Sequence, residues 1–303
     1  MLPHLTKMSF DWVMNENVEA DMGVLMRGPE RGLRWMDDRG FTFHVHRADN
    51  GKCAANFHTT DPFFYFHIAN CFERPVVEGG EAMELVVDIG AYVGTSTDHN
   101  PMDELLLPIG QVRRTGWDAI CEHEMELRRY ALPLPAHDAP LPAEAPTVAI
   151  QEAGFETLWK GAFGFLSINE EKRGEPYRYV FSNGGPTQPN PPTLFKVDVE
   201  TGQEWFWEGH DPARHFPAEP QFVPRPKPDD GSEQAEDDGV MLSVVYDAGA
   251  ERSFMLILEG TTFEEVGRAW LPPQTHVPLV NHGRWFEQEG FGGVAAAAAA
   301  ARQ

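Results

Sequence analysis

Short apolar stretches with a two-residue alternation recur along this 303-residue chain, and turns rich in glycine or proline separate them. Residues 41–46 alternate in this way, and Asn50 and Gly51 follow as a hairpin turn before a return segment at 53–57. Residues 239–246 and 253–258 repeat the pattern. The 28 glycines and 25 prolines favour short strands over long helices. Serial antiparallel hairpins predict an all-β protein, either a propeller or a large barrel.

Other segments predict strands of different character. Residues 63–72 are apolar at most positions, so we expect a strand buried on both faces at the centre of a sheet. Residues 176–181 predict a strand that ends at a Ser-Asn-Gly-Gly turn, 182–185. Further strands are expected at 84–92, 117–133, 194–199, 204–207 and 266–271.

Two histidines have apolar or tightly turned surroundings. His67 lies inside the apolar run 61–73, and His282 lies in the segment 277–285 near the other end of the chain. A buried imidazole needs a hydrogen-bond partner or a metal. We expect the fold to bring His67 and His282 together around a metal, although a backbone carbonyl is the commoner partner of a buried histidine. The other ten histidines lie in polar or loop contexts and are interpreted as surface residues.

Imidazole ligands suit iron, copper or zinc, and a metal-binding histidine usually donates its second N–H to a carboxylate. Glu219, which directly precedes the segment 220–226, is the candidate for that carboxylate. A surface glutamate at the end of a strand would fit the same pattern. Residues 236–239 are acidic, but they lack the spaced oxygen ligands of an EF-hand and are interpreted as a turn.

Several classes of function are disfavoured by composition and by the motifs present. A formal net charge of −23 repels phosphate backbones, so no nucleic-acid partner is expected. The chain contains neither a dinucleotide- or phosphate-binding glycine motif nor a nucleophile elbow. Its three cysteines form no CxxC pair, which argues against a thiolate zinc site and fits a reducing compartment such as the cytoplasm or a plastid.

Several of these segments resemble, in the same order, motifs of the carotenoid cleavage oxygenase family. That family includes carotenoid dioxygenases and the retinal pigment epithelial membrane protein. Residues 60–73 are similar to a family block that carries a histidine ligand, and 277–283 are similar to the final ligand motif. Residues 219–226, followed by 236–243, form the most specific match.

The resemblance implies a seven-bladed β-propeller in which four histidines hold Fe(2+) and three glutamates support them. Carried over by position, His67 and His282 match two of the four metal ligands, and Glu219 matches one supporting glutamate. A further supporting glutamate is expected at a position that is Gly164 here. His4 lacks the surroundings of a ligand and is not assigned.

The other two ligands would belong to segments before residue 1, so the chain resembles the C-terminal portion of a family member. We therefore expect residues 1–290 to form a partial propeller domain that lacks its N-terminal blades, followed by a low-complexity, alanine-rich tail at 291–303.

The implied activity is that of an Fe(2+)-dependent dioxygenase that cleaves a C=C double bond of a carotenoid or apocarotenoid with O2. Its partners would be an apolar polyene and O2, with peripheral membrane contact as the route to the substrate. Two alternatives stay open. One is a non-catalytic, truncated propeller relative with weak or no iron binding, which the missing ligands and Gly164 favour. The other is a stilbene-cleaving dioxygenase, which would share the same site.

Overall fold

The structure is a computed structural model. It describes residues 18–20, 33–35, 40–93, 124–136, 150–185, 193–209, 211, 213–228, 230–275, 277 and 282–285. Regular structure in these residues consists of strands and one 3₁₀ turn, η3 (Glu170–Lys172), so the all-β prediction is confirmed. Within the same residues, no helix has the length and apolar character that a membrane span requires. The predicted tail at 291–303 lies outside the described residues.

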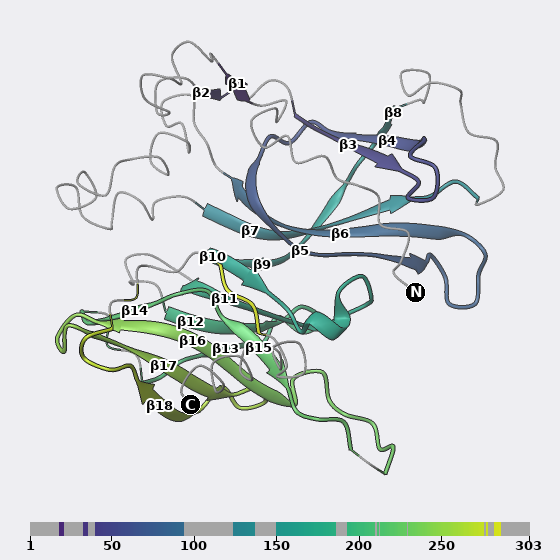
Figure 1. The fold of residues 1–303 in the computed structure, drawn as a ribbon. Coiled ribbons are helices and arrows are strands. Elements are labelled where there is room, and N and C mark those ends of the chain that lie inside the picture. The colour runs from purple at the N-terminus through teal and green to yellow at the C-terminus, as the bar shows by residue number, and fades with distance from the viewer. Residues whose placement is uncertain are drawn as a thin grey trace, which may run out of the picture.

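The strands form five sheets (Figure 1). The first sheet pairs β1 (Val18–Ala20) with β2 (Leu33–Trp35). The second contains β3 (Phe41–His46), β4 (Cys53–Thr59) and β8 (Ile150–Glu152). The third has the order β5 (Phe64–Pro75), β6 (Met83–Val93), β7 (Glu124–Pro133) and β9 (Phe155–Lys160). The fourth has the order β10 (Ala162–Ser167), β11 (Tyr179–Gly185), β12 (Thr193–Asp198) and β13 (Glu204–Phe206).

The fifth sheet contains β14 (His215–Pro217), β15 (Gln221–Pro224), β16 (Gly239–Asp247), β17 (Arg252–Glu259) and β18 (Glu265–Trp270). Both β14 and β15 pair with β16. The third and fourth sheets are antiparallel meanders of four strands, which is the strand arrangement of a propeller blade. Strand β8 departs from this order, because it pairs in parallel with β4 before the chain returns to β9.

Strand β5 corrects one prediction. It was expected at the centre of a sheet, but among the described strands it lies at the edge, where β6 is its neighbour. Both of its faces are nevertheless apolar, because the sheet packs between two others. Phe72 belongs to the hydrophobic cluster shared with the β10–β13 sheet, whereas Tyr65 packs against the cluster shared with β3 and β4. Sheet-on-sheet packing, rather than flanking strands, explains the apolar run.

A second correction concerns the expected turn at 182–185. These residues continue β11, in which Ser182 pairs with Phe195 and Asn183 pairs with Leu194. Ser-Asn-Gly-Gly is typical of turns on local propensity, but strands β10 and β12 on either side impose extended structure. The turn at residues 236–237 and the strands predicted at 84–92, 239–246 and 253–258 are confirmed, with ends that differ by only a residue or two.

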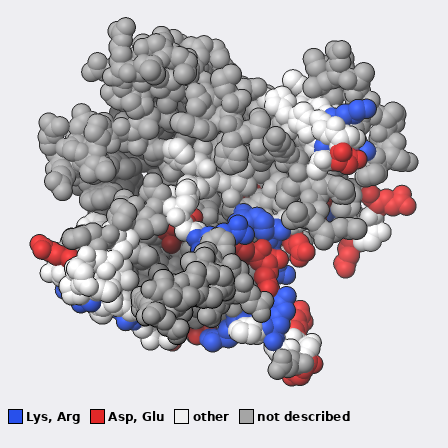
Figure 2. All heavy atoms as spheres, viewed as in Figure 1, with Lys and Arg blue, Asp and Glu red and all other residues white. Residues whose placement is uncertain are grey.

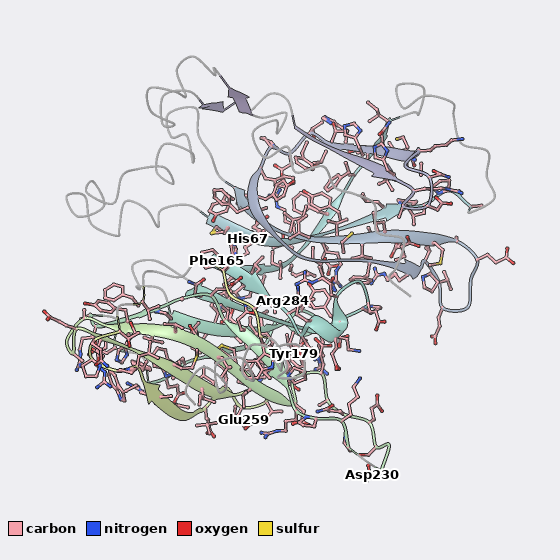
Figure 3. The ribbon with its side chains drawn as sticks, viewed as in Figure 1. His67, Phe165, Tyr179, Asp230, Glu259 and Arg284 are labelled. Carbon is pink, nitrogen blue, oxygen red and sulfur yellow. The ribbon has the colours of Figure 1, made fainter. Side chains whose placement is uncertain are left out.

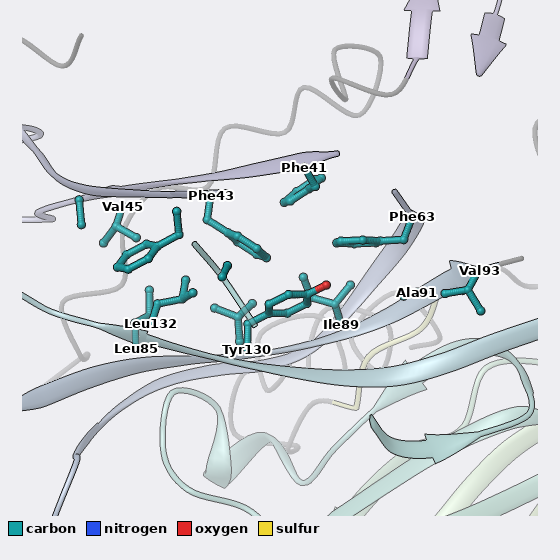
Figure 4. Close-up of a cluster of buried hydrophobic side chains, with 14 residues drawn as sticks. Phe41, Phe43, Val45, Phe63, Leu85, Ile89, Ala91, Val93, Tyr130 and Leu132 are labelled. Carbon is teal, nitrogen blue, oxygen red and sulfur yellow. The ribbon is translucent and has the colours of Figure 1, made fainter. Parts of the chain in front are cut away.

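Hydrophobic clusters join the second, third, fourth and fifth sheets, each to the next. In the first cluster, the rings of Phe41, Phe43, Phe63 and Tyr130 fill the space between the β3–β4 layer and the β6–β7 layer (Figure 4). The ring centroids of Phe41 and Phe63 lie 4.8 Å apart, as do those of Phe43 and Tyr130. A second cluster lies between the third and fourth sheets, and a third between the fourth and fifth. The sheets are therefore stacked in series by burial of apolar surface.

Polar side chains also tie neighbouring sheets together. Asn70 of β5 is buried, and its amide donates to the carbonyls of Lys172 and Glu175, each at 3.0 Å. Its carbonyl accepts the N–H of Gly174, also at 3.0 Å. One asparagine thus holds the loop after β10 against the strand that carries His67.

The fourth and fifth sheets share a buried ion pair. Lys196 of β12 is fully buried, and its ammonium lies 2.5 Å from a carboxylate oxygen of Asp237. It also donates to the carbonyls of Gly260 and Thr261, at 2.8 and 3.1 Å. Because the charge has several acceptors, the cost of removing it from water is largely offset.

Charged side chains of both signs lie interspersed on the face in Figure 2, where basic residues gather near the junction of the third and fourth sheets. Several ion pairs among the described residues are exposed, such as Arg173 with Glu170 at 2.5 Å. Among the described residues on this face, acidic side chains therefore alternate with basic ones.

Candidate metal site

Two imidazoles that are distant in the sequence lie together where the third and fourth sheets face each other. His67 projects from β5, and His282 belongs to the described residues 282–285. Their ring centroids are 5.8 Å apart and the ring planes are inclined at 66°. Figure 3 shows His67 where its sheet faces the sheet of β10, with the segment that carries Arg284 passing beside it. The structure thus brings together the two histidines singled out from the sequence.

Phe165 of β10 completes a triangle of rings. Its centroid lies 5.4 Å from that of His67 and 5.2 Å from that of His282, and both contacts are edge-on. The phenyl ring thus covers one side of the histidine pair with apolar surface. Phe66 and Tyr92 add a further aromatic contact nearby, with centroids 5.8 Å apart.

Glu219 holds His282 in place. It lies between β14 and β15, and its side chain is mostly buried whereas that of His282 is exposed. One carboxylate oxygen of Glu219 is 3.2 Å from Nδ1 of His282, and the other accepts the N–H of Gly283 at 2.7 Å. A proton on Nδ1, donated to the carboxylate, leaves the Nε2 lone pair of His282 available to a metal.

Burial and the nearby His282 ring lower the pKa of His67 to about 4. The imidazole is therefore neutral at physiological pH, which is the form that binds metals. Within the described residues, the ring of His67 has aromatic neighbours but no hydrogen-bonding carboxylate of the kind that Glu219 provides for His282.

The spacing of the two imidazoles fits a shared metal ion. Metal–imidazole bonds of about 2.1 Å place the ring centroids of two ligands on one ion about 4.5 to 6.5 Å apart, depending on the angle between the bonds. The separation between His67 and His282 lies inside this range. Among the described residues, however, no group of three or more His, Cys, Asp or Glu side chains is arranged to hold a metal. The assignment of His67 and His282 as ligands, and of Glu219 as their support, stays a prediction.

Gly164 lies on β10 next to Phe165, where the resemblance implies a glutamate. A Cβ atom at this position would lie 2.5 Å from the amide oxygen of Asn183. The space beside the glycine is therefore filled by an asparagine side chain from β11. Phe165 and Asn183 are site residues that the sequence analysis did not identify.

The described residues also form a cavity of about 400 Å³, lined by parts of the β3–β4 hairpin, β6 and the segment after β7. Its walls include Arg47, Glu73 and Glu81, but neither histidine. It is therefore separate from the histidine pair.

Comparison with known sequences extends the description beyond geometry. A family model described as retinal pigment epithelial membrane protein matches residues 8–287. Torulene dioxygenase of Fusarium fujikuroi is 32% identical over 248 residues, which cover 79% of this chain and 40% of that protein. Carotenoid cleavage dioxygenase 8, chloroplastic, of Arabidopsis thaliana is 28% identical over 262 residues, which cover 85% of this chain and 41% of that protein. The chain thus spans about two fifths of the length of these curated relatives.

Solved structures show the same fold. The cobalt-substituted Synechocystis apocarotenoid oxygenase aligns with a TM-score of 0.61 at 23% identity, over 84% of this chain and 46% of that one. A variant of the same oxygenase aligns with a TM-score of 0.64 at 23% identity, over 90% of this chain and 50% of that one. The stacked meanders are therefore similar to part of a β-propeller of this kind. The number of blades and the partial domain at 1–290 stay predictions.

Proposed function

Because the chain belongs to the retinal pigment epithelial membrane protein family, the carotenoid cleavage oxygenases, we propose that it provides part of an Fe(II) site in a dioxygenase. The substrate would be a carotenoid or apocarotenoid, in which one C=C double bond is cleaved with O2. The names of the relatives, a torulene dioxygenase and a carotenoid cleavage dioxygenase, support this class of substrate.

The observation that carries the proposal is the convergence of His67, His282 and Glu219. Neutral imidazoles with open coordination positions beside them suit non-haem iron. When bound, Fe(II) would supply the one-electron chemistry that a closed-shell polyene needs in order to react with O2. A complete set of protein ligands for iron would require residues beyond the two imidazoles found in the described residues.

Each residue of the site has a distinct task in this proposal. Glu219 fixes the orientation of His282 and increases its basicity through the Nδ1 hydrogen bond. His67 is kept neutral by burial. Phe165 covers one side of the pair, where it would exclude water and offer an apolar contact to the polyene.

A non-catalytic relative with weak or no iron binding is the second candidate. It is favoured by Gly164, which lacks a carboxylate, and by the absence of a third ligand among the described residues. A stilbene-cleaving dioxygenase would use the same residues and differs only in substrate. Peripheral membrane contact and a cytoplasmic or plastid location stay predictions.

Iron stoichiometry tests the proposal. The purified chain is loaded anaerobically with Fe(II), desalted and analysed, alongside His67→Ala, His282→Ala and a His58→Ala control. His58 is a suitable control because its ring bonds to Thr42 on β3, in a different sheet. We expect bound iron in the unaltered chain and in the control, and none in the other two variants. Iron that stays at the same level in His67→Ala would overturn the ligand assignment.

Incubation of the iron-loaded chain with carotenoids, apocarotenoids and a stilbene then separates the candidates. Cleaved aldehyde products from a polyene would support the dioxygenase. Cleavage of the stilbene alone would assign the other substrate class. If the unaltered chain retains no iron, the second candidate, a non-catalytic relative, is supported instead.

A further inference from the structure

Strand β10 pairs irregularly with β11 at one place, directly beside the histidines. The paired residues on either side of the irregularity are Phe163 with Gly184 and Leu166 with Ser182. Gly164 and Phe165 therefore stand opposite the single residue Asn183. Two residues against one make a β-bulge, which bends the strand and changes the direction of a side chain. Here the affected side chain is that of Phe165, whose ring contacts both imidazoles.

The side chain of Asn183 closes this bulge. In a bulge the extra residue drops out of the ladder of backbone hydrogen bonds. The N–H of Phe165 instead donates to the amide oxygen of Asn183 at 2.8 Å. An unpaired N–H in this partly buried position would be costly, so the side chain takes the place of a backbone partner.

The other end of the same amide reaches the fifth sheet. Its nitrogen donates to the carbonyl of Pro217 at 3.4 Å. Pro217 ends β14, two residues before Glu219, which holds His282. A single side chain thus bridges the strand that presents Phe165 and the segment that presents the supporting carboxylate.

Gly164 makes room for this bridge. A Cβ atom here would lie 2.5 Å from the amide oxygen of Asn183 and 3.2 Å from its Cγ. Even the smallest side chain would therefore displace the amide or the strand. Where the resemblance implies a glutamate, this chain thus has a glycine. The neutral amide of Asn183 takes up the space beside it and bonds two backbone groups.

We propose that Asn183 is a positioning residue of the histidine site. Its side chain locks the Gly164–Phe165 bulge, which sets the phenyl ring against both imidazoles, and anchors the segment that leads to Glu219. The effect on iron rests on the proposed function, whereas the effect on the position of Phe165 does not.

The test compares Asn183→Ala and Asn183→Asp with an Asn56→Ala control in the full chain. Asn56 is likewise a strand asparagine with a hydrogen-bonded side chain, but it is buried, bonds the ring of His44 and lies in the sheet of β3 and β4. Three quantities are measured: the exchange rate of the Phe165 amide, the chemical shifts of the His67 ring protons, and the affinity for Fe(II) by chelator competition.

In Asn183→Ala we expect the Phe165 amide to exchange at least about tenfold faster, because its partner is lost. The His67 ring protons should shift as the phenyl ring moves, and Fe(II) affinity should fall roughly tenfold, as for other residues that orient metal ligands. Asn183→Asp keeps the acceptor, so protection of the Phe165 amide should be retained. If the alanine variant does not fold, the aspartate variant still decides the question, because loss of that protection in it contradicts the proposal.

The two proposals can fail separately. Unchanged Phe165 exchange and unchanged His67 shifts in Asn183→Ala would overturn the positioning role, whatever the iron affinity. If the Phe165 amide exchanges faster in Asn183→Ala but the Fe(II) affinity is unchanged, the bulge has no effect on metal binding. If the unaltered chain binds no iron, the proposed function fails, while the exchange and shift measurements still decide the role of Asn183.

Discussion

Glu219 holds His282 directly and through the next residue, because its carboxylate bonds both the imidazole Nδ1 and the backbone N–H of Gly283. The second bond fixes the chain on which the ring is mounted, so the ring has little freedom to turn. Such two-point support suits a residue that, like the other described residues of 282–285, lies outside any strand.

Glu219→Gln should weaken Fe(II) binding roughly 10- to 100-fold, because a neutral amide makes the imidazole less basic and can accept at only one atom. Affinity is measured by competition with a chromogenic chelator. Glu259→Gln is the control, since Glu259 pairs with Arg225 on another part of the fifth sheet. Equal affinities of the Glu219→Gln variant and the unaltered chain would rule out the supporting role.

Gly164→Ala should destabilise the fold by about 1 to 3 kcal/mol, because the added methyl group overlaps the Asn183 amide. In an Asn183→Gly background the same change should cost less, because only the 3.3 Å contact with the backbone oxygen of residue 183 remains. The double-mutant cycle should therefore give a coupling of about 1 kcal/mol or more. Urea unfolding provides the free energies. Gly267→Ala is the matched control, a strand glycine whose added Cβ would meet nothing within 4 Å. Purely additive effects would contradict the contact.

Asp198 should make stability depend on acid pH. Its side chain is buried, which alone would raise its pKa, but hydrogen bonds from Arg178 and from the residues of the following turn lower the pKa to about 2. Because this value lies below that of the unfolded chain, the ionised carboxylate stabilises the fold above about pH 4, and the contribution disappears as the pH falls toward 2. Asp198→Asn should therefore cost about 1 to 2 kcal/mol at pH 7, a value reduced by the exposure of Arg178, and much less near pH 2.5.

The measurement for Asp198 is urea unfolding at several pH values. Glu78→Gln, a change in the exposed β5–β6 turn, serves as the control. A cost of Asp198→Asn that does not change with pH would show that the carboxylate is not ionised and bound as described.

Lys196→Met should destabilise the fold by about 3 to 5 kcal/mol, because it leaves the Asp237 carboxylate buried without its cation. Replacing both residues, Lys196→Met with Asp237→Leu, should recover much of that loss. Thermal and urea unfolding measure both effects. Lys227→Met, at an exposed pair with Glu171, should change stability by less than about 0.5 kcal/mol. A small effect of Lys196→Met would mean that the buried pair contributes little.

Strands were predictable where a clear alternation in the sequence reflects one buried and one exposed face. Residues 239–246 and 253–258 alternate in sequence and alternate in burial as β16 and β17. The prediction was wrong at 182–185. The composition there is typical of turns, but pairing with β10 and β12 holds these residues in an extended strand. It was also wrong about the location of β5 in its sheet. A strand whose sheet packs between two other sheets has an apolar run like that of a strand at the centre of a sheet.

The site was predictable only in part. His67, His282 and Glu219 could be identified from their surroundings and from the family resemblance. Phe165 and Asn183 could not, because a bulge changes which residues oppose each other and leaves no trace in the apolar periodicity. The information lies in the pairing of two strands rather than in either segment alone.

The parallel pairing of β8 with β4 also constrains how the protein is made. Strand β4 receives this neighbour from residues 150–152, which follow β7 of the next sheet. On the ribosome, the edge of β4 that β8 covers therefore stays open until those residues have emerged. The two sheets must mature as an interlocked unit rather than one after the other during translation. In that interval the backbone N–H and C=O groups along this edge of β4 are without their partner strand.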